Sequence, residues 1–203
     1  AGVKESYASW VKTQAAEAAE LSEFGGAPSR AIERMDRVVL RIEKGLRLLK
    51  TDPDAMRCFE LANRAMHMQM VHSSADYAKS TKSKGHAYVP PKYGDSKWAH
   101  FSWRPFQLAF QLLVIESLAN RNSTEREVVD LIWFPTGGGK TEAYLAVAAF
   151  ELFYRRVKYG DAGGGTAVIK RYTLRLLTAQ QFERVSALIC ACEMLRRENT
   201  DEL

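Results

Sequence analysis

Cysteine is scarce in this chain, and the cysteines present form no disulfide framework. Among 203 residues there are 3, namely Cys58, Cys190 and Cys192. Secreted domains that depend on disulfides carry several cysteine pairs, so that class of protein is excluded. Cys190 and Cys192 lie two positions apart on an expected helix, where their side chains point to different faces and make a poor pair of metal ligands. We expect all three to be small buried hydrophobic residues in a reducing compartment.

Histidines, a targeting leader and long apolar runs are also lacking. The 4 histidines show neither an HExxH motif nor the arrangement of a catalytic triad. The first residues carry no charged and apolar leader, and no apolar run is long enough to cross a bilayer. We therefore expect a cytoplasmic protein with no membrane partner. The net charge of +5 favours anionic partners instead.

The first feature that the sequence does have is a helical region over residues 1–72. We expect an Ala/Glu-rich helix over 4–23, an amphipathic helix over 29–50 and a third helix over 53–72. Basic residues recur every three or four positions along the second helix, so they share one face. This stripe is either a track for a phosphate backbone or an ordinary solvated face. Its members are Arg30, Arg34, Arg37, Arg41 and Lys44.

Residues 73–102 form an expected loop that is rich in lysines and aromatic residues. Lysines interleaved with aromatic rings suit single-stranded nucleic acid, because bases stack on the rings while the lysines neutralise the phosphates. Packing of the same rings onto the helices is the alternative. The aromatic residues of this loop and of its C-terminal boundary are Tyr77, Tyr88, Tyr93, Trp98, Phe101 and Trp103.

The most informative segment is residues 134–141, which read Phe-Pro-Thr-Gly-Gly-Gly-Lys-Thr. An apolar run over 128–134 predicts a buried strand before this segment, and residues 140–159 have the composition of a mostly buried helix. Glycines let backbone N–H groups approach phosphate oxygens at a helix start, where the helix dipole also favours an anion. We therefore predict a phosphate-binding loop for a nucleoside triphosphate, with Lys140 and Thr141 as the catalytic residues and the Thr141 hydroxyl as the Mg²⁺ ligand. The residues expected to bind the nucleotide here are Thr136, Gly137, Gly138, Gly139, Lys140 and Thr141.

A second strand is expected over residues 166–171, after a glycine-rich turn. Together with the first strand and the helix between them, it predicts a strand, helix, strand unit of a parallel sheet. The turn that follows carries hydroxyl groups, arginines and the N–H groups of a helix start, all of which suit phosphate contacts. A plain amphipathic helix start is the alternative. The candidate nucleic-acid contacts are Arg171, Thr173, Arg175, Thr178 and Gln180.

These segments together resemble superfamily 2 helicases and translocases. Residues 134–141 resemble motif I of that family, although Phe134 stands where the general loop pattern has glycine and where this family usually has another small residue. Residues 171–181 resemble motif Ia, and Arg104 and Gln107 resemble the glutamine element that contacts adenine in the family. Gln107 as an ordinary helix-start residue is the alternative. Residues 103–107 and 171–183 are most similar to the helicase subunit of DISARM anti-phage systems.

The resemblance implies an α/β fold with two RecA-like lobes and Mg-ATP bound between them. We expect residues 103–203 to be the front part of a RecA-like P-loop NTPase lobe with parallel strands, residues 73–102 to be the basic, aromatic loop, and residues 1–72 to be a helical accessory region. The implied partners are nucleic acid, DNA rather than RNA, the second lobe in the rest of the same chain, and other defence-system subunits.

Motif II, the Asp-Glu pair that should follow an apolar strand, is not recognisable. Asp201 and Glu202 follow polar residues instead. We therefore expect the chain to be the front part of a larger ATPase and to be inactive alone. Two other functions would use the same loop: a P-loop NTPase that acts as a switch or phosphotransferase without translocation, and an interaction scaffold that retains a phosphate.

Overall fold

The computed structural model describes residues 2–74, 91–135, 137–171 and 175–199, which form two compact units. The first unit combines Ala1–Pro53 with Arg104–Trp133, and the second combines Asp54–Trp103 with Phe134–Leu203. The sequence-based division at residues 72 and 102 stays a prediction. Within the described ranges no helix has the length and apolar character needed to cross a membrane.

The first unit is built on the long helices α1 (Gly2–Ala19), α2 (Ala27–Thr51) and α5 (Pro105–Ala119), with the short 3-10 helices η1 (Ser22–Phe24) and η3 (Thr124–Glu127). α1 and α2 run side by side and are joined by a tight connection at Gly25, whose φ is 57°. α2 and α5 approach each other closely at Gly45, where a Cβ atom would overlap the carbonyl oxygen of Leu112. The core beside this crossing contains Ile42, Leu112 and Ile115, all nearly inaccessible to solvent.

The second unit contains α3 (Pro53–His72), η2 (Ser96–Trp98), α6 (Lys140–Tyr159), η4 (Gly160–Gly163) and α7 (Arg175–Glu198). α6 packs against α7, and it buries Leu145, Phe150 and Phe153. Leu188 and Leu195 are the corresponding buried residues of α7. The expected helix is present, and it buries one side, with 7 of its 20 residues buried.

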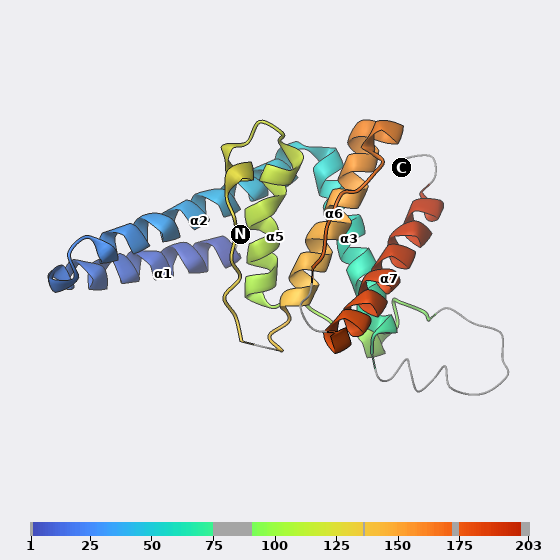
Figure 1. Ribbon diagram of the computed structural model, residues 1–203, viewed down its shortest axis with the longest axis horizontal. Coiled ribbons are helices and arrows are strands. Elements are labelled where there is room, and N and C mark those ends of the chain that lie inside the picture. Colours follow the sequence, from blue (N-terminus) through green and yellow to red (C-terminus); the bar gives the residue numbers. More distant parts are fainter. Residues whose placement is uncertain (1, 75–90, 136, 172–174, 200–203) are drawn as a thin grey trace. The chain divides into compact units, whose positions relative to one another are not determined.

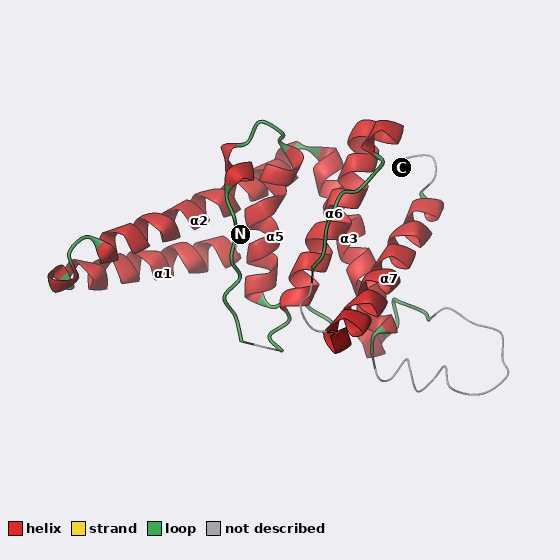
Figure 2. Cartoon of the chain, viewed as in Figure 1, coloured by secondary structure: helices red, strands yellow, loops and turns green. Residues whose placement is uncertain are grey.

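The expected α/β fold is wrong. Helices and loops are the only elements that Figure 2 shows among the described residues, and no strand is present there. The two segments expected to be strands, 128–134 and 166–171, lie within the described ranges and form no ladder. Their apolar side chains face outward: Val129 is 94% exposed, Trp133 89% and Ile169 87%. β-branched and aromatic residues favour an extended backbone, but a strand exists only where a neighbour accepts its backbone hydrogen bonds.

Candidate nucleotide site and its surroundings

The predicted phosphate-binding loop forms a tight turn that leads directly into α6. Gly137 and Gly139 have φ values of 79° and 88°, in the left-handed region that favours glycine. Gly139 is the N-cap of α6, and Lys140 is the first helical residue. This arrangement presents the N-terminal end of a 20-residue helix to an anion. Thr136 lies outside the described residues.

Lys140 folds back over this loop. Its Nζ atom donates to the carbonyl oxygens of Phe134 at 2.5 Å and Pro135 at 3.1 Å. A positive charge is thereby placed beside the N-terminus of α6. Thr141 follows in the first turn of α6 and is partly exposed, so its hydroxyl is a suitable ligand for Mg²⁺ bound with a nucleotide. The glycine turn, the N-terminus of the helix, the lysine and the hydroxyl fit Mg-ATP.

Phe134 explains why residue 138 is a glycine. A Cβ atom at Gly138 would overlap the ring of Phe134 and lie 3.0 Å from the carbonyl oxygen of Pro135. The N–H group of Gly138 also donates to that oxygen, at 3.1 Å. The large residue at the position where the resembled family has a small one therefore packs under the middle glycine of the turn.

Two polar contacts made by side chains of α7 were not predicted from the sequence. Arg184 on α7 forms an ion pair with Glu142, the residue that follows Thr141 on α6. Burial lowers the pKa of the Arg184 guanidinium from its ordinary value, although an arginine stays charged at physiological pH. Nearby, Lys170 donates from its Nζ atom to the Oε1 atom of Gln181 at 3.3 Å. Both contacts join segments that are distant in sequence, which residue spacing does not reveal.

Gln107, the candidate adenine contact, caps its own helix. Its Oε1 atom accepts a hydrogen bond from the backbone N–H of Arg104 at 2.8 Å, and the side chain is buried. This is the helix-start role that was the alternative for Gln107. Gln107 and the phosphate-binding loop belong to different units, and the adenine contacts of Gln107 and Arg104 stay predictions.

The candidate nucleic-acid contacts lie around the start of α7. Arg171 is exposed at the end of the extended segment, and Gln180 is exposed on the helix. α7 begins at Arg175, so Arg175 and Thr178 fall in its first turns, while their side chains and all of Thr173 lie outside the described residues. Contact with nucleic acid stays a prediction for all five.

The described aromatic residues near the 73–102 loop pack onto α3. Trp103 donates from its indole Nε1 to Asn63 at 2.5 Å, and the ring of Phe101 meets that of His67 edge-on with centroids 6.2 Å apart. Trp98 is buried, and Tyr93 contacts α3 through its carbonyl and hydroxyl oxygens. For these residues the packing alternative holds. Tyr77 and Tyr88 lie outside the described residues.

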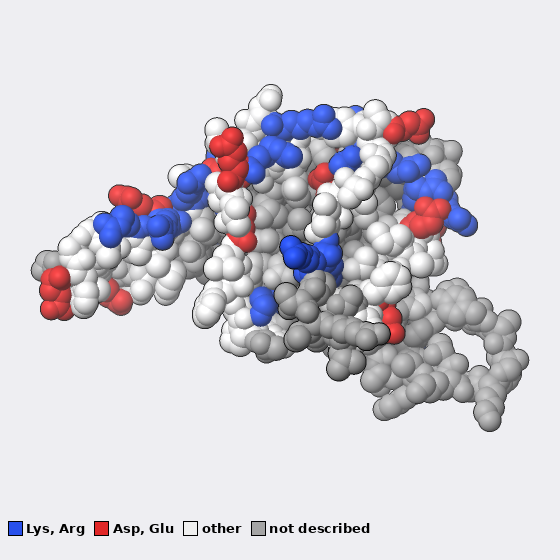
Figure 3. All heavy atoms as spheres, in the orientation of Figure 1, with Lys and Arg blue, Asp and Glu red and all other residues white. Residues whose placement is uncertain are grey.

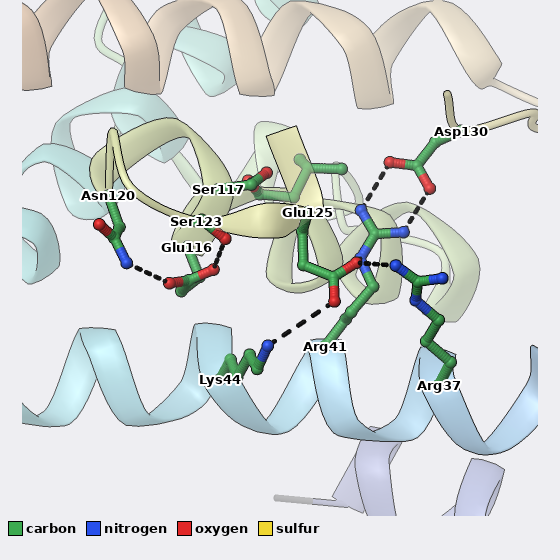
Figure 4. Close-up of polar contacts among 10 residues, drawn as sticks. Arg37, Arg41, Lys44, Glu116, Ser117, Asn120, Ser123, Glu125 and Asp130 are labelled. Atoms are coloured by element: carbon green, nitrogen blue, oxygen red, sulfur yellow. Dashed lines mark hydrogen bonds and ion pairs between the residues drawn. The ribbon is translucent and has the colours of Figure 1, made fainter. Parts of the chain in front are cut away.

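The basic stripe of α2 is divided by burial. Arg41 is 5% exposed, and its Nη1 and Nη2 atoms donate to the two carboxylate oxygens of Asp130 at 2.5 and 2.7 Å. Figure 4 shows Glu125 among the basic side chains of α2. Its carboxylate oxygens lie 3.1 Å from Nη2 of Arg37, 3.4 Å from Nε of Arg41 and 3.7 Å from Nζ of Lys44. The hydrogen bonds to Asp130 raise the pKa of Arg41 above its ordinary value.

Acidic and basic atoms accordingly lie side by side over α1 and α2 in Figure 3. Arg37, Arg41 and Lys44 form internal ion pairs, and of these only Arg41 is buried. Arg30 and Arg34 are exposed. Asp130 was the one residue in the sequence that indicated these ion pairs, because a carboxylate inside an apolar run needs a cation nearby.

The cysteines follow the sequence expectation in two of three positions. Cys58 and Cys192 are buried, and burial raises the pKa of the Cys192 thiol to about 12. Cys190 is exposed, so the expectation is wrong for that residue. No group of three or more potential metal ligands occurs among the described histidines, cysteines and carboxylates.

Comparison with known proteins adds one match. The chain is similar to DISARM protein DrmA of Bacillus paralicheniformis. The two are 39% identical over 179 residues, which is 85% of this chain but only 15% of the length of that relative. No family model matches the chain. The predicted resemblance to a DISARM protein is thereby confirmed, while the helicase part of that prediction stays a prediction.

Proposed function

We propose that the chain is the ATP-binding portion of a superfamily 2 helicase or translocase that acts on DNA in anti-phage defence. The observation that carries this proposal is the glycine turn with left-handed Gly137 and Gly139, which ends at the N-terminus of α6 beside the charge of Lys140. The similarity to DISARM protein DrmA supports the defence role and the association with other defence subunits.

Two residues of the loop would have different roles, one stabilising negative charge and one binding the metal ion. Lys140 would stabilise charge that develops on the phosphoryl group, and Thr141 would hold the Mg²⁺ bound with the nucleotide. When bound, Mg-ATP would supply a phosphoryl group for transfer to water. The glycines of the turn bring backbone N–H groups to the phosphates without a side chain in the way.

The test is ATP hydrolysis by the full-length protein, with and without single-stranded DNA, duplex DNA or RNA. We expect DNA to stimulate hydrolysis and Lys140→Ala to lower the rate by roughly 100-fold or more. Lys158→Ala, in the last turn of the same helix, is the matched control and should keep the rate.

Two outcomes would contradict the proposal in different ways. Hydrolysis that depends on Lys140 but ignores every nucleic acid would indicate a switch or phosphotransferase. Undiminished hydrolysis by folded Lys140→Ala protein would show that the loop is not the nucleotide site.

A further inference from the structure

One ion pair joins the helix of the phosphate-binding loop to the helix that follows the candidate nucleic-acid turn. An oxygen of the Glu142 carboxylate contacts Nη2 of Arg184, and the two side chains are 18% and 28% exposed. Both helices, α6 and α7, belong to the same unit. Water and salt screen a pair at this depth less than they screen an exposed pair. The contact therefore links the first turn of α6 directly to α7.

The position of each partner gives the pair its significance. Glu142 lies two residues after Lys140 and directly after Thr141, in the first turn of α6. Arg184 lies four residues after Gln180, so the two share a face of α7 about one turn apart, roughly 6 Å along the helix axis. Gln180 is exposed, as a contact for nucleic acid must be. Gln180 is thus linked to the phosphate-binding loop through one side-chain contact, the ion pair of Arg184 with Glu142.

The start of α7 is also tied to the segment before it. Lys170 donates to Gln181, which is the neighbour of Gln180, at 3.3 Å. A ligand that moves the first turns of α7 would therefore act on Arg171 at one end and on Glu142 at the other. A continuous helix transmits such a shift because its turns are joined by backbone hydrogen bonds.

We propose that Glu142 and Arg184 are a positioning pair that couples nucleic-acid binding at the start of α7 to ATP binding at the start of α6. This inference rests on the proposed function. When Gln180 and its neighbours move toward a phosphate of the bound nucleic acid, Arg184 moves with them on the same helix. Glu142 and the first turn of α6 follow through the ion pair. Coupling of this kind is reciprocal, so ATP must strengthen or weaken nucleic-acid binding by the same factor.

The experiment measures the dissociation constant of a nonhydrolysable ATP analogue from the full-length protein, with and without a saturating DNA oligonucleotide. For the unchanged protein we expect DNA to alter this constant about fivefold or more, the lower end of typical coupling between sites. Glu142→Gln and Arg184→Gln should bring the ratio close to one. The double variant Glu142→Arg with Arg184→Glu restores opposite charges and should recover the response. Arg196→Gln is the matched control, because Arg196 pairs with Glu193 within α7 itself, at 2.7 Å.

The possible failures are distinguishable. An unchanged protein that binds no ATP analogue refutes the proposed function and this inference together, and so does one that binds no DNA. An unchanged protein that binds both, but with a ratio of one, refutes the coupling alone. A full DNA response in both single variants overturns the inference. A lower affinity for the ATP analogue and for DNA, with a lower melting temperature but an unaltered ratio of dissociation constants, also overturns it, because a pair that only stabilises the fold would have this effect.

Discussion

Replacing Arg41 by alanine should be the most destabilising single change among the charged residues of α2. The substitution removes both hydrogen bonds to Asp130, at 2.5 and 2.7 Å, and the contact with Glu125 at 3.4 Å. Arg41 is itself 5% exposed, so water cannot take over its role in the folded protein. The neighbouring basic residues of the helix lose nothing comparable when they are truncated.

The size of the loss in stability depends on the contacts that each carboxylate retains in the variant. Removing one member of a buried ion pair costs about 3–5 kcal/mol, because the other charge stays buried without its partner. Glu125 retains Arg37 at 3.1 Å and Lys44 at 3.7 Å, and the side chain of Asp130 is 24% exposed and can be partly hydrated. We therefore expect the lower end of that range, about 3 kcal/mol. This loss is a large share of the roughly 5–15 kcal/mol by which folded proteins are stable.

Urea unfolding followed by circular dichroism measures this loss. A reduction of about 3 kcal/mol should lower the midpoint by roughly 1 M at an unchanged slope. Arg34→Ala, an exposed residue of the same helix, should change the stability by less than about 0.5 kcal/mol. Arg41→Lys should recover only part of the loss, because an ammonium cannot donate to both oxygens as the planar guanidinium does. Equal stabilities of the Arg41→Ala and Arg34→Ala proteins would refute the reasoning.

Three further predictions concern other parts of the chain. Gly138→Ala should displace the loop from the Phe134 ring and lower ATP hydrolysis by the full-length protein about 100-fold, the cost of a 1 Å misplacement; an unchanged rate would show that the loop accommodates the methyl group. At pH 8, a thiol reagent should label Cys190 and leave Cys192 unlabelled until the protein unfolds, because burial raises the Cys192 pKa to about 12; equal labelling of both would contradict that burial. Burial lowers the pKa of His72, so its contribution to stability is present above the unfolded pKa of 6.5 and is lost as the pH falls below that value. His72→Gln should therefore flatten this part of the plot of stability against pH. An identical plot for the variant would show that His72 does not cause the pH dependence.

The helices were predictable because their signals are local. The expected helices over 29–50 and 53–72 correspond to Ala27–Thr51 and Pro53–His72, and the helix over 140–159 corresponds to Lys140–Tyr159. Apolar periodicity and the positions of glycine and proline fix such elements within a few residues of sequence. The glycine turn at residues 137–139 was readable for the same reason, because its chemistry lies in consecutive residues.

The strands failed because pairing is not a local property. Val129, Leu131 and Trp133 belong to the apolar run that predicted a buried strand, yet they are 94%, 83% and 89% exposed. Composition predicted the extended backbone but not a neighbouring strand to complete it. The ion pairs were missed on the same ground: Arg41 and Asp130 are 89 residues apart, and no spacing rule joins them.

The basic stripe on α2 shows why a charge pattern must be divided by burial before a partner is assigned to it. A track for phosphates and a solvated face both require exposed charges, and Arg41 at 5% exposure fits neither. The sequence held one signal, an aspartate inside an apolar run, and the buried Arg41 is the cation that this carboxylate pairs with. A buried cation needs a carboxylate and a carboxylate in an apolar segment needs a cation, so such residues are best considered as candidate partners first. Arg30 and Arg34 are exposed members of the stripe to which the structure assigns no internal ion pair, so they are the members best placed to attract an anionic polymer.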